Sequence, residues 1–106
     1  MAKFVMIVQS DPLEGRDAEY NAWYDGTHIP ELLQIPGITA ARRLEATPIV
    51  VGAPGAKYIT FYEIEAENPG AVMAEMGARG ADGRMSRSVA VDSSKATIWV
   101  YADKRT

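Results

Sequence analysis

The strongest constraint on the fold is the segment 57–65 (KYITFYEIE), which alternates as a β-strand does but carries large apolar side chains on both faces. Successive residues of a strand point to opposite sides of a sheet. Tyr58 and Tyr62 therefore share one face. Ile59 and Phe61 share the other. A strand of this kind needs cover on both sides.

The other periodic segments give the order β-α-β-β-α-β, which predicts an α+β, ferredoxin-like fold with a four-stranded antiparallel sheet. Pro30 cannot donate a backbone amide, so the first helix should break or kink near His28. Residues 81–95 are rich in Gly, Ser and Arg, and we expect them to be mobile. The predicted strands are 3–9, 38–46, 57–65 and 96–102, and the predicted helices are 13–25 and 68 to 77 or 80.

Two helices can cover only one face of such a sheet. An exposed apolar face is either an interaction surface or an aggregation hazard. Pairing the open faces of two copies about a two-fold axis removes that hazard in the commonest oligomer symmetry. We therefore expect a homodimer forming a dimeric α/β barrel, and the alternative is a monomer with a half-polar sheet face.

Length and composition limit the number of domains and the kinds of partner that the protein can bind. A chain of 106 residues predicts one domain over 1–106. The net charge of -3 and the pI of about 5.1 give no attraction for phosphate backbones, so we expect no nucleic acid. No apolar run approaches the ~20 residues that span a bilayer, and the N-terminus lacks a signal cleavage site. We predict a cytoplasmic protein without a membrane partner.

Composition also excludes several kinds of catalytic and metal-binding site. The chain has no cysteine, which excludes thiolate nucleophiles, cysteine-ligated zinc and iron–sulfur clusters. His28 is the sole histidine, which excludes a multi-histidine metal site within one chain. The glycines form no phosphate-binding fingerprint. We therefore predict neither a metal nor a cofactor.

Residues 20–43 (YNAWYDGTHIPELLQIPGITAARR) contain a W-Y pair, an H-x-P motif and a P-G pair in this order. The stretch resembles the dimeric α/β-barrel superfamily, most closely EthD-type and stress-responsive A/B-barrel proteins; polyketide cyclases, cofactor-free monooxygenases and muconolactone isomerases are similar small barrels. The resemblance implies a ferredoxin-like protomer, a dimer and a pocket between helices and sheet. It does not identify the reaction, because these barrels host many chemistries. The residues that carry it are Trp23, Tyr24, His28, Pro30, Pro36 and Gly37.

His28 is the sharpest candidate for catalysis, because imidazole exchanges protons near neutral pH with an ordinary pKa of ~6.5. A helix end beside it would favour the neutral form. Asp25 or Tyr24 can orient the ring if helical geometry persists that far. The alternative is that His28 caps a kink and bonds unpaired backbone carbonyls.

Aromatic and basic residues complete the predicted site. Tyr20 and Tyr24 are predicted to be catalytic, each offering a phenol as acid or oxyanion donor. Trp23 is predicted to line the pocket, although core packing explains it as well.

The predicted substrate-binding set also includes residues of the sheet. Arg43 can hold a carboxylate or enolate, with a solvent-exposed or intersubunit ion pair as the alternative. Tyr62 and Trp99 can extend the pocket from the sheet, with dimer packing as the alternative. Arg79, Arg84 and Arg87 lie where a lid could close, or else on a solvated loop.

These residues fit a cofactor-independent enzyme that moves a proton on a small apolar aromatic or carbonyl compound, by isomerisation, cyclisation, elimination or dehydration. They also fit a non-catalytic ligand-binding or accessory protein of a catabolic pathway. Cofactor-free monooxygenation is a third hypothesis. A free nitrogen of His28 facing a cavity would favour catalysis, and a ring bonded to backbone at both nitrogens would favour binding.

Overall fold

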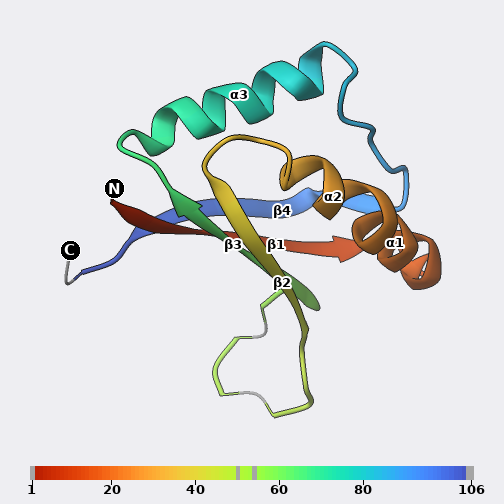
Figure 1. Cartoon of the computed structure of the whole chain (residues 1–106). Helices are drawn as coiled ribbons and strands as arrows, with labels where there is room; N and C mark the ends of the chain where they lie inside the picture. Colours follow the sequence, from red (N-terminus) through yellow and green to blue (C-terminus); the bar gives the residue numbers. More distant parts are fainter. Residues whose placement is uncertain (1, 50, 54, 105–106) are drawn as a thin grey trace.

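A four-stranded antiparallel sheet carries the helices on one of its faces (Figure 1). The computed structural model describes residues 2–49, 51–53 and 55–104. The strand order β2-β3-β1-β4 with antiparallel neighbours confirms the predicted ferredoxin-like α+β fold. In chain order the elements are β1 (Lys3–Pro12), α1 (Asp17–Trp23), the π-helix η1 (Tyr24–His28), α2 (Ile29–Leu32), β2 (Ile38–Glu45), β3 (Tyr58–Glu65), α3 (Pro69–Ala81) and β4 (Val91–Ala102).

The strand register assigns each side chain to a face, because directly paired residues point to the same side. Met6 pairs with Tyr62 and Val100, and this row faces the helices. Ile7 pairs with Phe61 and Trp99, and this row faces away from them. Met6 and Tyr62 on the helix-facing side are fully buried, whereas Trp99 on the open side is 62% exposed.

The core lies between the sheet and the helices. Helix α3 is capped by Asn68, whose Oδ1 accepts a hydrogen bond from the Gly70 amide at 2.9 Å. The turn before β2 brings Gly37 against this helix with φ at +100°, and a Cβ there would lie 3.0 Å from Val72 Cγ2. Glycine is therefore required at this turn. The buried core residues are Met6, Leu32, Ile35, Ile38, Tyr62, Ile64, Val72 and Met85.

The predicted break near His28 is absent, because the backbone stays helical from α1 through η1 into α2. The Ile29 amide bonds Tyr24 O, five residues back, so the turn widens instead of ending. Pro30 gives the reason, since its ring would collide with the carbonyl four residues earlier and it donates no hydrogen bond. The wider π-turn avoids the clash and accommodates the missing hydrogen bond, so the helix continues.

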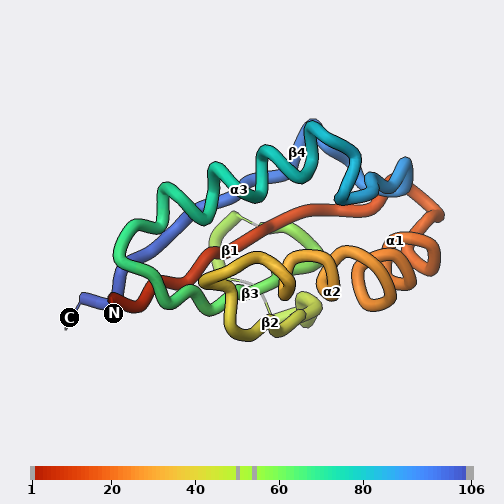
Figure 2. Tube along the Cα trace, turned by 45° about the horizontal axis from the view of Figure 1, so that its top comes forward, coloured from red at the N-terminus to blue at the C-terminus, as the bar shows by residue number. Residues whose placement is uncertain are grey.

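The segment after α3 is more ordered than the sequence predicted. Strand β4 begins at Val91, so five residues assigned to a mobile segment belong to the sheet. We call residues 82–90, which lead from α3 to β4, the strap. Figure 2 shows the strap running past the end of α3 toward the region of α1 before β4 begins. Among the described residues, no helix has the length and apolar character needed to cross a bilayer.

Candidate functional site: a cavity beside His28

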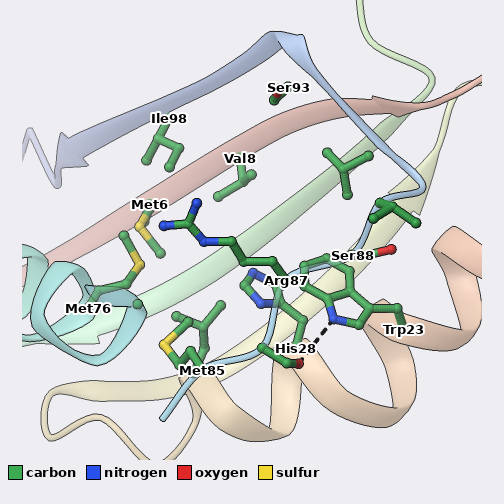
Figure 3. A pocket seen from close by; sticks show the side chains of 15 residues that line it. Met6, Val8, Trp23, His28, Met76, Met85, Arg87, Ser88, Ser93 and Ile98 are labelled. Atoms are coloured by element: carbon green, nitrogen blue, oxygen red, sulfur yellow. Dashed lines mark hydrogen bonds between the residues drawn. The ribbon is translucent and has the colours of Figure 1, made fainter. Parts of the chain in front are cut away.

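A cavity of about 630 Å³ lies between the helix-facing side of the sheet and the elements that cover it (Figure 3). The volume suits a compound of drug-like size. Its walls come from β1, β4, the ends of α1, η1, α2 and α3, and the strap. Its lining residues are Met6, Val8, Trp23, His28, Leu32, Met76, Gly80, Met85, Ser86, Arg87, Ser88, Val89, Val91, Ser93 and Ile98.

An irregularity between β1 and β4 helps to explain why this region is hollow. Strand β4 has four residues between Asp92 and Thr97, where β1 has one residue between Gln9 and Asp11. Extra residues on one strand bend it and disrupt the ladder. Figure 3 shows β4 turning sharply near Ser93, which lines the cavity.

His28 enters the cavity from η1 and is held by aromatic rings. Its imidazole stacks on Trp23 with ring centroids 4.3 Å apart, and Tyr24 meets it edge-on at 5.1 Å. Asp25, expected as an orienting group, instead accepts a hydrogen bond from Arg43 at 3.0 Å. Packing against Trp23 and Tyr24, rather than a bond to a carboxylate, therefore sets the orientation of the His28 ring.

The His28 ring makes no hydrogen bond to any described residue. Its Nδ1 is buried without a partner, whereas Nε2 is not enclosed in this way. Burial lowers the pKa of His28 to about 4, and the charge of Glu31 opposes this only in part. The imidazole is therefore neutral at pH 7, and the group that Nε2 meets decides its tautomer, because Nδ1 is unpaired in either.

Tyr20 and Tyr24, predicted to be catalytic, lie outside the cavity lining in a second cluster. We call Ser10, Tyr20, Tyr24, Tyr58 and Arg43 the aromatic cluster. The Tyr20 hydroxyl bonds the Ser10 hydroxyl and donates toward the Ser10 carbonyl at 3.3 Å. Burial raises the pKa of Tyr20 to about 12. This phenol is therefore committed to a buried internal bond.

Arg43 lies in the same cluster and not in the cavity lining. Its guanidinium carbon lies 4.8 Å from the Tyr24 ring centroid, 5.3 Å from that of Tyr58 and 5.6 Å from that of Tyr20. Its nitrogens donate to Asn21 at 2.8 Å and to Asp25 at 3.0 Å. Arg43 thus joins η1 and α1 to β2 through intramolecular partners.

The two predicted sheet residues also lie elsewhere. Tyr62 is fully buried in the core, and burial raises the pKa of its phenol well above the ordinary value. Its hydroxyl makes no well-formed hydrogen bond to any described residue, although the Thr60 side chain lies near it. Trp99 stands on the open face, opposite Ile7, because its odd position on β4 points it away from the helices. Of the seven predicted site residues, Trp23 and His28 line the cavity.

The strap supplies Met85 and Ser86, which the sequence did not predict for the site, and Arg87, which it predicted only as part of a lid or of a solvated loop. Ser86 fixes it to the helices: its amide donates to Glu31 at 3.2 Å, and its hydroxyl accepts from Trp23 Nε1 at 3.4 Å (Figure 3). Met85 and Arg87 flank this anchor and line the cavity. One sequence signal could have singled out Arg87, since no acidic residue lies within four positions of it, whereas Arg84 follows Asp82 by two.

Solved structures share this arrangement of strands and helices. A crystal structure of an ethyl tert-butyl ether d (EthD) family protein from Bacillus halodurans superposes with a TM-score of 0.60 at 18% identity, covering 97% of this chain and 99% of that one. An EthD-like protein from Ralstonia eutropha gives 0.59 at 19% identity, covering 94% and 90%. The chain has the EthD-type fold. The likeness predicted from residues 20–43 is thus confirmed at the level of the fold.

A third structure, HapK from Hahella chejuensis, superposes with a TM-score of 0.52 at 15% identity and covers 98% of this chain and 91% of that one. Neither a protein-family model nor a curated protein matches the sequence. Within the described residues, no three His, Cys, Asp or Glu side chains are grouped closely enough to hold a metal ion.

Proposed function

We propose that the protein binds a small, largely apolar compound in the cavity beside His28 and transfers a proton on it without a cofactor. The observation that carries the proposal is that the chain's sole histidine borders an apolar cavity with an unbonded Nε2. Because burial keeps this imidazole neutral at pH 7, its lone pair is available to accept a proton. An apolar site with few polar groups is typical of small-ligand pockets.

The proposed step suits a carbonyl compound with an acidic C–H bond. The Nε2 lone pair takes the proton, the C–H bond breaks, and its electron pair moves to the carbonyl oxygen to give an enolate. The imidazolium then returns the proton to the same carbon or, where a carbon–carbon double bond is conjugated with the enolate, to the far carbon of that double bond, which isomerises the compound. Removal of water from the cavity strengthens each charge interaction in this sequence.

Non-catalytic binding is the second candidate, and the placement of the phenols favours it. The hydroxyl of Tyr20 bonds Ser10, and neither Tyr20 nor Tyr24 lines the cavity. The cavity therefore has one side chain suited to proton transfer rather than an acid and base pair. An accessory protein would use the same walls without turnover.

Exchange of the α-protons of 2-tetralone in D₂O, followed by NMR, separates these candidates, because this ketone is flat, apolar and enolisable. Catalysis predicts exchange faster than in buffer for the wild type, and loss of that acceleration in His28→Gln with 2-tetralone still bound. Arg84→Gln, on the strap but outside the cavity lining, is the matched control and should exchange as the wild type does. Binding without acceleration would instead support the accessory role, and absence of binding would count against both.

We also propose that the protein is a homodimer joined through the open faces of the two sheets. The row Phe61, Ile7 and Trp99 crosses three neighbouring strands on the side that no described helix covers. Trp99 and Tyr101 are 62% and 51% exposed there, which is unusual for neighbouring aromatic residues of a monomer. A second copy brings the same row to cover it.

Sedimentation equilibrium tests this assembly. The wild type should sediment as a dimer, and Trp99→Glu should shift it toward monomer by placing a charge in the interface. Leu33→Glu is the matched control, because Leu33 is 41% exposed at the end of α2, in the helix layer on the other side of the sheet. A monomeric wild type would contradict the assembly.

A further inference from the structure

We propose that the ligand of this cavity carries an anionic oxygen, a carboxylate or an enolate, and that Arg87 binds it. This inference rests on the cavity being a ligand site, as proposed above, and it adds the chemical class of the ligand. It does not depend on whether His28 catalyses a reaction.

The charge balance of the cavity is the first argument. Of its fifteen lining residues, Arg87 is the one with a charged side chain at neutral pH, and none is acidic. The other polar members are neutral: His28 and three serines of the strap and β4. An apolar wall with one cation matches a flat apolar molecule with one negative group, since guanidinium pairs with carboxylate oxygens through two parallel hydrogen bonds.

The second argument is that Arg87 has no competing partner among the described residues. Arg84 donates to Asp82 at 2.7 Å, and Arg79 donates to Glu75 at 3.0 Å. Arg87, by contrast, has neither an ion pair nor a hydrogen bond within the part of the chain that the structure describes. Figure 3 shows its guanidinium extended over the cavity toward Met6.

The strap holds Arg87 in place from both sides. Before it, Met85 is buried and its amide donates to the Arg79 carbonyl at 3.1 Å. After it, Ala90 is fully buried and its carbonyl accepts from the Leu13 amide at 2.6 Å. Anchors this close to Arg87 limit where its side chain can reach, which lowers the cost of ordering it on a ligand.

His28 complements Arg87. Neutral imidazole with its proton on Nε2 can donate a hydrogen bond to an oxygen anion, and the anion would stabilise the protonated ring in turn. The same arrangement would favour an enolate formed from a ketone, because negative charge develops on the oxygen. The proposed ligand class therefore fits either candidate function.

The matched probes are 2-naphthoate and its neutral isostere 2-naphthamide, with affinities measured by isothermal titration calorimetry. The wild type should bind naphthoate at least ~10-fold more tightly, as expected for a charge-assisted bond. Arg87→Gln should remove this preference and leave the affinity for naphthamide unchanged. Arg87→Lys should retain part of it, and Arg84→Gln should retain all of it.

The outcomes separate this inference from the proposed function. Naphthamide binding as tightly as naphthoate in the wild type would overturn the anion assignment and leave the cavity as a ligand site. A preference for naphthoate that survives in Arg87→Gln would overturn the role of Arg87. Failure of the wild type to bind either probe would count against the cavity as a site for flat aromatic compounds and overturn both proposals.

Discussion

The aromatic cluster and the cavity beside His28 lie on the same face of one sheet but differ in how their polar groups are partnered. In the cluster, the phenols of Tyr20 and Tyr58 bond nearby side chains, and two nitrogens of Arg43 do so while its Nε stays buried without a partner. At the cavity, His28 and Arg87 bond no described residue. Polar groups that satisfy each other stabilise the fold, whereas unpartnered ones beside a hollow remain available to a ligand.

This contrast changes the interpretation of the conspicuous residues. Tyr20 and Tyr24 were predicted to be catalytic and Arg43 to bind substrate, yet their partners are internal. Changes in the aromatic cluster should therefore alter stability and spare ligand binding. Changes at the cavity should do the reverse.

The largest expected effect is that of Arg43→Met, which we predict lowers the free energy of unfolding by about 3 kcal/mol, because contacts with three rings and a partly buried bond to Asn21 are lost. Urea denaturation at matched protein concentration measures this loss. Arg84→Met, at an exposed arginine paired with Asp82, should leave the midpoint unchanged. If Arg43→Met were as stable as the wild type but bound the ligand more weakly, Arg43 would belong to the ligand site and the structural role would be wrong.

The next effect depends on pH. Because the pKa of His28 falls from 6.5 to about 4 on folding, the unfolded chain binds more protons between these values and stability falls as the pH falls through them. Relative to His28→Gln, the wild type should lose about 2 kcal/mol between pH 6.5 and pH 4, after allowance for its partial exposure. Parallel urea titrations at the two pH values give the difference. Equal pH dependence in both proteins would show that the ring is solvated.

The smallest expected changes in stability are those caused by removing the hydroxyl of either of two buried tyrosines. Tyr20→Phe removes a hydroxyl that bonds Ser10 and should cost about 1 kcal/mol, with binding of 2-naphthamide unchanged. Tyr62→Phe removes a buried hydroxyl that makes no well-formed hydrogen bond and should change stability by less than about 0.5 kcal/mol. Thermal denaturation gives the loss of stability in each variant. A larger loss in Tyr62→Phe than in Tyr20→Phe would contradict the hydrogen bonding described for the two hydroxyls.

Sequence patterns were sufficient to predict the fold. Alternation over 57–65 placed Tyr62 and Phe61 on opposite faces as the register has them, and the segment order fixed the antiparallel sheet. Trp99 was predicted to extend the pocket, with dimer packing as the alternative, and the register places it on the open face with Ile7. The pairing of β4 with β1 decides this face, and a local pattern does not contain the pairing of distant strands.

The candidate site was less predictable, because it depends on contacts between residues that are far apart in the sequence. His28 and Trp23 were placed correctly beside a pocket, since a single histidine flanked by aromatic residues and a proline is a local signal. Whether Arg43 faces a ligand or three rings depends on how β2 packs on α1, which no local pattern reveals. Arg87 was predicted only as part of a lid, with a solvated loop as the alternative, because a serine- and arginine-rich segment resembles such a loop until its anchors are seen.

The most direct test of the central claim follows the single histidine by NMR. With ¹³C-labelled histidine, the Cε1 signal belongs to His28 without further assignment. Addition of 2-naphthoate should shift this signal and raise the pKa of His28 from about 4, because the bound anion stabilises the imidazolium. Saturating binding of 2-naphthoate that leaves both the signal and the pKa unmoved would contradict the placement of the ligand beside His28.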